Sequence, residues 1–459
     1  MTSDASVRAG GLASLARMPD ALADLSSRPS LMRAFRRCIP ELATGQLALT
    51  DVEPRRVRLR DGPCTATYDL TIGNGDCERR IRLQGLADPW GAFDLEMPEP
   101  TVPLGAPDWR CGVPELHLTL TSTPADTALT ALSTLADPVT SRALLTDALQ
   151  QHTAYRNVQV RWCEPTIARY KPGSRCTVVY RIGYDSGHAG PSRVIAKTYS
   201  GDKGRTAFDG MVGLWDSSLR SSVHVAVAEP LAFFDDLNVL VQGPVAGLET
   251  MKECLKRGLA TGDLGIIGQA LRRTARGLAT LHGCGVRAAS VTVRQERDEV
   301  QHRAVRLSRW APEAGPRVSA WLSSLDGCAH AWPADEPVPS HGSFRPAQVL
   351  VDGDDVGFID FDGFCEAEPA MDLALFIATV KNLGMRAAAP GEQVEHLCDG
   401  FVDEYRMHAP VTPERIALWE ALFHVTNLLN CWAKVRPERI RGSLALLDRH
   451  IGLAGLPPI

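Results

Sequence analysis

The middle of the chain carries the hydrophobic pattern of short β-strands. β-Branched and aromatic side chains fill Thr166–Tyr170 and Cys176–Tyr180, with the turn residues Pro and Gly between them in Lys171–Arg175, which predicts a hairpin. Apolar runs at Val223–Leu231 and Val239–Gln242 predict further strands. Together these segments are predicted to form a small antiparallel sheet.

A helical pattern follows this strand-rich part. Apolar side chains recur at helical spacing from Ile267 to Leu281, and Gly283 is placed where glycine caps a helix C-terminus. His282 is therefore expected to be a last-turn helix residue and not a ligand. The remainder, Leu375–Ile459, is predicted to be helices separated by turns that contain proline. Strands followed by helices indicate the α+β class.

Composition restricts the location and the partners. The chain has 459 residues, 44% of them hydrophobic, and a net charge of −5, which suits two or three packed domains. The dispersed, mildly acidic charge argues against nucleic-acid or anionic-membrane partners. Ile416–Ala433 is interrupted by Glu420, His424 and Asn427, so we expect a core helix and not a membrane span.

Cysteine usage points to a reducing compartment. The twelve cysteines include no C-x-x-C pair and no Cys/His cluster with zinc spacing, and 1–16 has no apolar run of the secretory kind. We therefore expect reduced, mostly buried thiols and a cytoplasmic protein.

The most specific chemical signal is Ser340–Gln348, followed by Ile359-Asp360-Phe361-Asp362. It resembles the H-G-D-x-x-x-x-N loop and I-D-F/W motif of the aminoglycoside phosphotransferase and choline kinase-like family, a branch of the protein-kinase-like fold. Ser343 replaces the loop Asp, and Gln348 replaces the Asn. The resemblance continues in Ala367–Ala374, which matches the family's G-D-P-x-x-D-L-A segment with Ala367-Glu368 in place of Gly-Asp.

The resemblance implies an ATP-dependent kinase that uses Mg²⁺. In such enzymes the loop Asp accepts the substrate proton, the loop Asn and the second-strand Asp hold magnesium, and a strand Lys contacts the phosphates. Asp360 and Gln348 are the corresponding metal ligands here. Lys197, in Val194-Ile-Ala-Lys, corresponds to the phosphate-binding Lys, with an ordinary solvated strand Lys as the alternative interpretation.

The family's catalytic positions are altered. A serine hydroxyl without a carboxylate behind it cannot accept a proton at neutral pH as Asp can. Ser343 therefore leaves the chemistry without its usual base, although positioning and electrostatics supply much of phosphoryl-transfer catalysis. Arg345 supplies a candidate cation for the transferring phosphate, and Asp362 is a candidate replacement carboxylate. His341 and Asp372 are expected to hold the loop.

The same resemblance implies a nucleotide site. Lys171 and Ser174 lie in the hairpin that would cover the nucleotide, and backbone groups from Gln242 to Val245 would meet the adenine. Asp209, in a helix predicted over Gly204–Trp215, is a candidate partner for Lys197, with a surface Asp as the alternative.

The resemblance predicts a two-lobed kinase-like fold with a small-lobe sheet at 151–247, a large helical lobe at 248–459 and an α+β extension at 1–150. Leu59–Tyr68 echoes Tyr170–Tyr180, with Arg80–Leu83 in the place of Val194–Lys197. The extension is therefore interpreted as a degenerate small-lobe repeat, with chance similarity of two hairpins as the alternative.

Two functional classes follow. The first is a kinase that phosphorylates a hydroxyl of a sugar, an aminocyclitol or an amino alcohol. The second is a pseudokinase that binds a nucleotide or a partner protein without phosphoryl transfer. A hydrolase built on His341 and Ser343 is disfavoured, because no orienting acid or G-x-S-x-G elbow accompanies them. Acids in the C-terminal helices are expected either to line the acceptor pocket or to form a solvated face: Glu392, Glu395, Asp399, Asp403 and Glu404.

Overall fold

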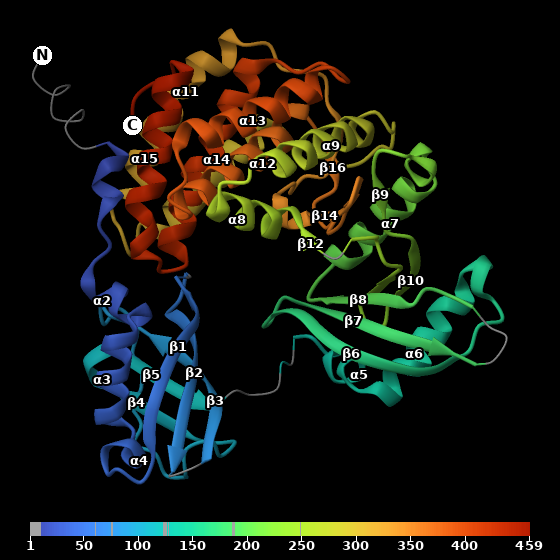
Figure 1. The fold of residues 1–459 in the computed structure, drawn as a ribbon. Helices are drawn as coiled ribbons and strands as arrows, with labels where there is room; N and C mark the ends of the chain where they lie inside the picture. The colour runs from blue at the N-terminus through green and yellow to red at the C-terminus, as the bar shows by residue number, and fades with distance from the viewer. Residues whose placement is uncertain are drawn as a thin grey trace, which may run out of the picture. The chain divides into compact units, whose positions relative to one another are not determined.

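The computed structural model describes residues 11–59, 61–74, 77–122, 126, 128–185, 189–247 and 249–459 (Figure 1). The chain forms two compact units that are not consecutive in sequence. The first unit comprises 1–125, 293–331 and 421–459, and the second comprises 126–292 and 332–420. The lobes expected at 151–247 and 248–459 stay a prediction.

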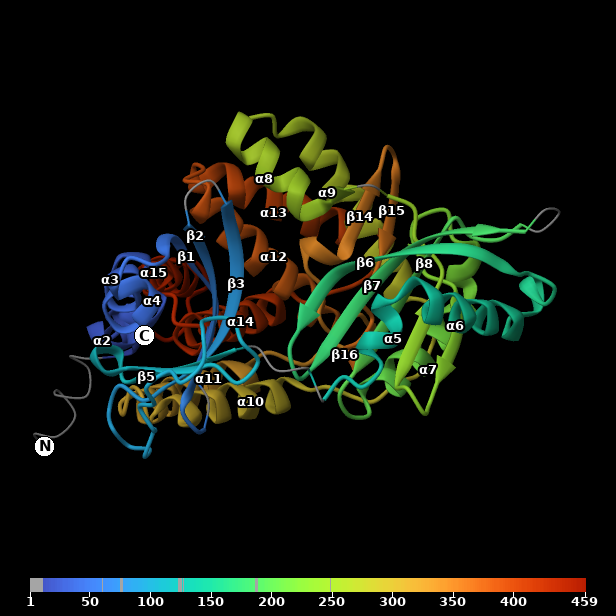
Figure 2. The same cartoon turned by 90° about the horizontal axis from the view of Figure 1, so that it is seen from below.

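A five-stranded antiparallel sheet organises the second unit, in the order β10-β11-β8-β7-β6. Alternate side chains of β7, among them Val178 and Tyr180, are buried in one hydrophobic cluster with Leu145 and Leu149 of helix α6, which lies along the sheet in Figure 2. This period-two burial is what the β-branched pattern predicts. The strands and their flanking helices are β6 (Val160–Lys171), β7 (Arg175–Tyr184), β8 (Arg193–Tyr199), β10 (Pro230–Phe234), β11 (Val239–Gln242), α5 (Leu132–Ala136), α6 (Pro138–Gln151) and α7 (Lys203–Trp215).

The expected strand at Val223–Leu231 is divided into two. β9 (Ala226–Val227) pairs in parallel with β15 (Asp355–Phe358), whereas β10 begins at Pro230 and pairs with β11. The chain changes sheets between them, and the Glu229 carbonyl accepts a hydrogen bond from the backbone N–H of Gly243.

Helices dominate the rest of the second unit. The side chains predicted from helical spacing, including Ile267 and Leu278, are buried on α9 (Gly265–His282), which packs against α13 (Gly391–Arg406). The α+β class is thus confirmed. The other elements are α8 (Met251–Thr261), α12 (Pro369–Arg386), β12 (Glu249–Thr250), β13 (Val338–Ser340), β14 (Val349–Asp352) and β16 (Cys365–Ala367). Helix α14 (Pro413–Ala433), which begins in the second unit and belongs to the first unit from residue 421 onward, covers the predicted Ile416–Ala433 segment.

The first unit contains a second five-stranded antiparallel sheet, in the order β1-β2-β3-β5-β4. Its elements are α3 (Arg28–Cys38), β1 (Ala48–Arg58), β2 (Cys64–Asn74), β3 (Cys77–Ala87), β4 (Arg110–Val113) and β5 (Leu118–Ser122), with the helices α10 (Val293–Leu307), α11 (Ala314–Ala331) and α15 (Pro437–Ala454). None of the helices in the described parts of the chain is long and apolar enough to cross a membrane.

The two sheets share strand order and register. Tyr68 lies opposite Pro54 just as Tyr180 lies opposite Pro165. The Tyr68 hydroxyl donates to the carbonyl of Leu25 at 3.0 Å, and the Tyr180 hydroxyl donates to the carbonyl of Leu135 at 2.7 Å. In both cases that carbonyl precedes the helix that packs on the sheet. This shared architecture supports the small-lobe repeat, which stays a prediction.

The register corrects the expected alignment of the two copies. Thr65 and Thr177 each follow the first cysteine of the matching strands; Thr65 pairs with Leu86, whereas Thr177 pairs with Lys197. Leu86, and not Leu83, therefore occupies the position of Lys197. Leu83 corresponds to Val194, because each lies opposite its sheet's buried tyrosine.

Candidate functional site

A cavity of about 410 Å³ in the second unit gathers much of the predicted site. Its lining comes from β6, β7 and β8, from the segment after β11, and from the segments around η6 (Pro346–Gln348) and Ile359-Asp360. Six residues singled out from the sequence line it: Lys197, Gln242, Val245, Arg345, Gln348 and Asp360.

Two short strands position the loops at this cavity. β13 ends just before His341 and pairs with β16, so the His341–Ser343 loop and the Asp360–Phe364 loop are held side by side. Gly342 has φ of +74°, and a Cβ atom there would lie 1.8 Å from the carbonyl oxygen of Gly363. Only glycine fits this contact without displacing the backbone. Asp360 also has a positive φ, of +71°, a conformation that non-glycine residues adopt mainly where surrounding structure imposes it.

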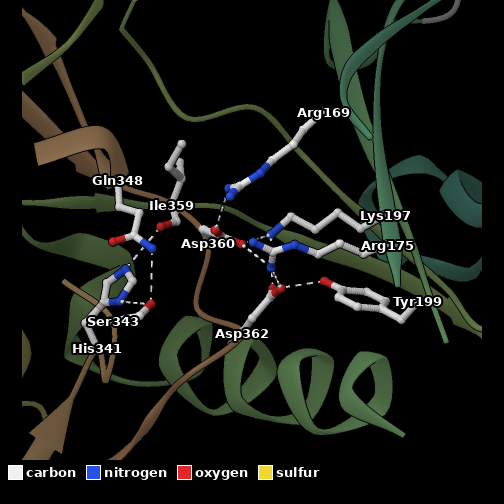
Figure 3. Close-up of polar contacts among 10 residues, drawn as sticks. All are labelled: Arg169, Arg175, Lys197, Tyr199, His341, Ser343, Gln348, Ile359, Asp360 and Asp362. Atoms are coloured by element: carbon white, nitrogen blue, oxygen red, sulfur yellow. Dashed lines mark hydrogen bonds and ion pairs between the residues drawn. The ribbon is translucent and has the colours of Figure 1, made fainter. Parts of the chain in front are cut away.

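Lys197 lies between two carboxylates (Figure 3). Its Nζ is 2.9 Å from Asp360 Oδ1 and 3.2 Å from Asp362 Oδ1. Burial alone would raise the pKa of Asp360, but Lys197 and Arg175 outweigh it and hold that pKa well below its usual value. Asp360 is therefore a carboxylate at neutral pH, and Lys197 is held at the cavity wall by two anions.

Arginines and a tyrosine complete this cluster. Arg175 forms an ion pair with Asp362 and lies 3.5 Å from Asp360, and Arg169 Nη1 lies 3.8 Å from the second Asp360 oxygen. The Tyr199 hydroxyl donates to Asp362 at 2.9 Å. Burial, reinforced by the Asp362 charge, raises the pKa of Tyr199 far above its ordinary value, so the hydroxyl keeps its proton.

Asp372 holds the His341–Ser343 loop by hydrogen bonds to its backbone. Its two oxygens accept hydrogen bonds from the backbone N–H groups of His341 at 2.6 Å and Gly342 at 3.0 Å. His282 Nε2 lies 3.3 Å from the same carboxylate, while its Nδ1 accepts from the Tyr405 hydroxyl at 2.7 Å. His282 is in the last turn of α9, as expected, and it links that helix to the Asp372 carboxylate.

Ser343 is bonded within the loop. Gln348 Nε2 donates to its hydroxyl oxygen at 3.1 Å, and the hydroxyl lies 3.4 Å from His341 Nδ1. His341 Nε2 donates to the carbonyl of Ile359 at 3.0 Å, which leaves Nδ1 as an acceptor for Ser343. Burial lowers the pKa of His341, which favours this neutral form.

The remaining predicted residues lie away from the cavity lining. Lys171 and Ser174 form the tip of the β6–β7 hairpin, where the Ser174 N–H donates to the Lys171 carbonyl at 3.0 Å. Asp209 does not meet Lys197. Its exposed side chain lies 3.8 Å from Arg205 one turn away, and the Lys197 ammonium pairs with Asp360 and Asp362 instead. Asp362 forms ion pairs with Lys197 and Arg175 and is outside the cavity lining.

The C-terminal acids divide between ion pairs and exposed faces. Glu395 contacts Lys381 at 3.0 Å, and Glu404 contacts Arg276 at 2.8 Å. None of the five acids named from the sequence lines the described cavity.

The sequence interpretation missed Arg169, Arg175 and Tyr199 as site residues. A periodicity signal was present, because Lys197 and Tyr199 are two apart on β8 and therefore share a face. Arg175 lies opposite Tyr199 across the strand pair, which brings it to that face as well.

Comparison with known proteins finds a similarity to one family. The model of the phosphotransferase enzyme family matches residues 215–411. This part of the chain is similar to that family. The second unit combines an antiparallel sheet with a mainly helical part, as in the kinase-like fold that the resemblance predicts.

Solved structures of phosphotransferases resemble the chain at low identity. Choline kinase from Cryptosporidium parvum is 10% identical with a TM-score of 0.48, covering 69% of this chain and 98% of that one. Ethanolamine kinase from Plasmodium vivax is 13% identical with a TM-score of 0.45, covering 73% and 95%. Aminoglycoside phosphotransferase APH(3'')-Id from Streptomyces rimosus is 18% identical with a TM-score of 0.41, covering 65% and 98%. No curated protein sequence matches the chain.

Proposed function

We propose that this protein binds ATP in the cavity and transfers the γ-phosphate to a hydroxyl group of a small molecule. The observation that carries the proposal is the Lys197–Asp360 pair, 2.9 Å apart at the wall of a cavity, in a unit whose helical part matches the phosphotransferase family model. A strand lysine and a loop carboxylate in this arrangement are the parts that contact phosphates and metal in kinases.

The cavity lining offers both kinds of surface that ATP requires. Ile195, Val179 and Val245 supply apolar surface for the adenine, near the chain segment that leaves β11. Lys197 and Arg175, which lie beside Asp360, and Arg345 supply positive charge for the phosphates. Arg side chains are well suited to phosphate oxygens because their N–H groups form a planar fork.

The donors for Mg²⁺ are also present. Asp360 supplies a carboxylate, and the Gln348 carboxamide oxygen is buried without a hydrogen-bond partner among the described residues. Hard oxygen donors of this kind, combined with substrate phosphates, suit Mg²⁺. When bound, the ion would neutralise charge on the transferring phosphate.

The loop orients the acceptor and lacks a strong base. Ser343 accepts from Gln348, and its own proton is directed towards His341. It can orient an incoming hydroxyl by hydrogen bonding, but it cannot remove the proton as a carboxylate would. The absence of that base lowers the expected rate by roughly 10²–10⁴-fold. We propose a slow kinase whose acceptor is a sugar, an aminocyclitol or an amino alcohol.

A pseudokinase is the second candidate, favoured by one observation. The two altered loop positions, Ser343 and Gln348, are hydrogen-bonded to each other at 3.1 Å. This hydrogen bond holds the loop together without any substrate, as a purely structural role would require. In this alternative the protein binds the nucleotide and acts on a partner protein. We expect either form in the cytoplasm, and its described cysteines are free thiols.

Thermal unfolding with and without ATP and Mg²⁺ tests the nucleotide site. Ligand at 100 times its dissociation constant should stabilise the protein by about 2.7 kcal/mol, and Lys197→Ala should lose this stabilisation. Transfer from γ-labelled ATP to a panel of sugars, aminocyclitols and amino alcohols then separates the two candidates. No stabilisation at millimolar ATP would overturn the ATP site.

A further inference from the structure

Asp360, the carboxylate expected to hold a metal, and its neighbour Asp362 are already neutralised by this chain's own cations. Asp360 meets Lys197 at 2.9 Å, Arg175 at 3.5 Å and Arg169 at 3.8 Å. Asp362 meets Arg175 and Lys197 and also accepts from Tyr199. A divalent cation approaching Asp360 would have to displace these partners.

The charge of the described cavity lining is strongly positive. Arg169, Arg175, Arg193, Lys197 and Arg345 line it, and Asp360 is the carboxylate in that lining. Such a surface attracts the full negative charge of a free triphosphate more strongly than a triphosphate whose charge Mg²⁺ has reduced.

The central cations are largely desolvated before any ligand arrives. The side chains of Lys197 and Arg175 are 9% and 22% exposed. Much of the cost of removing them from water has therefore been met in folding, so phosphate oxygens can replace carboxylate oxygens as their partners with little further loss of hydration.

We propose that the cavity binds ATP without a divalent cation, with Arg175 and Lys197 neutralising the phosphates. This inference rests on the proposed ATP site. It adds that Arg175, in the β6–β7 hairpin, neutralises phosphate charge during binding, which magnesium usually does. Phosphates that draw Arg175 and Lys197 towards them would also leave Asp360 free for a metal ion afterwards. Nucleotide would then bind first, and any metal second.

Titration calorimetry of the full chain with ATP, in EDTA and in excess MgCl₂, tests this directly. The expected ATP affinity in EDTA equals or exceeds that in magnesium. Arg175→Gln should lower the affinity in EDTA by about tenfold, as expected for one hydrogen bond to a charged group, and should make binding magnesium-dependent. Arg181→Gln is the matched control, because Arg181 lies on the same strand in an exposed pair with Glu164 and outside the cavity lining.

A second variant predicts a gain that misfolding cannot imitate. Asp362→Asn removes an anion that competes with phosphate for Arg175 and Lys197, so ATP affinity in EDTA should rise several-fold. Wild-type binding that occurs only with magnesium would overturn this inference and leave the ATP site standing. Binding in neither condition would overturn both. Weaker ATP binding by Asp362→Asn would show that its contacts serve structure and not charge balance, which also contradicts the inference.

Discussion

The backbone N–H of His341 donates to the carboxylate of Asp372 at a distance of 2.6 Å. This bond fixes the start of the loop that carries Ser343, and the same carboxylate holds Gly342 at 3.0 Å. Asp372 is fully buried, so its charge is satisfied by protein groups and not by water.

Asp372→Asn should therefore destabilise the protein by about 3 kcal/mol, the upper range for hydrogen bonds to a charged group. The carboxamide keeps the size of the side chain but presents an NH₂ group where two acceptors are needed. Chemical denaturation measures the loss. Asp352→Asn, at an exposed position at the end of β14, is the control and should change stability little. Equal losses of unfolding free energy in the two variants would show that the Asp372 carboxylate does not stabilise the loop.

Gly342→Ala should lower the free energy of unfolding by more than the positive φ of this residue alone would cause. A left-handed conformation costs an L-residue about 1–2 kcal/mol. At Gly342 the added Cβ would also overlap the Gly363 carbonyl oxygen. Gly353→Ala is the matched control, because Gly353 has φ of +56° and nothing within 4 Å of its Cβ position. Both unfolding free energies should be measured. Similar losses would mean that the two loops are not in tight contact.

Ser343→Asp should raise phosphoryl transfer, by at most roughly 10²–10⁴-fold, because it restores a general base at the loop position. The measurement is transfer from γ-labelled ATP to the acceptor panel. Ser343→Asn is the control, since it has nearly the same shape and cannot accept a proton. A rate that both variants leave unchanged on every acceptor would favour the pseudokinase.

Acidification should weaken the fold through His341. Burial lowers its pKa below the ordinary value of 6.5, so below about pH 6.5 the unfolded state binds a proton that the folded state does not. This contribution to stability is complete above pH 6.5 and decreases as the pH falls towards the lowered folded pKa. His341→Gln removes the difference, so unfolding free energies of the variant and the wild type should converge between about pH 7.5 and pH 5.5. Parallel pH curves would exclude this role.

ATP should bind once per chain even in a Leu86→Lys variant. Leu86 has the register position of Lys197, but Pro63 precedes the first strand cysteine where Arg175 does in the other sheet. A lysine alone therefore lacks the second cation. Calorimetry should give a stoichiometry of one for Leu86→Lys and no binding for Lys197→Leu. A stoichiometry of two would show that the first sheet retains a nucleotide site.

The sequence predicted the elements whose signal is local. The hairpin around Lys171–Arg175 and the buried face of α9 follow from turn residues and helical spacing, and Lys197 was singled out from a four-residue strand motif. Lys197 and Asp360 were expected in one nucleotide site, and the structure brings them into contact.

Contacts between distant segments were harder to predict. Asp209 was paired with Lys197 because both lay in the expected order along the chain, yet the side chain of Asp209 points to Arg205 on its own helix. Arg175 reaches Asp362, 187 residues away, only because the hairpin and the loop converge in three dimensions. Strand register has the same limitation, since a shift of three residues separated Leu83 from the correct counterpart, Leu86.

The matching sheets give the chain an internal comparison. Both retain the buried tyrosine, the proline opposite it and the hydroxyl bond to the carbonyl before the packing helix, whereas leucine stands in one copy where lysine stands in the other. The residues common to both sheets are those that folding of such a sheet requires. The positions at which the two sheets differ, such as Leu86 and Lys197, are those at which one sheet is suited to a ligand. Exchanging residues between the copies would separate the requirements of folding from those of binding within a single polypeptide.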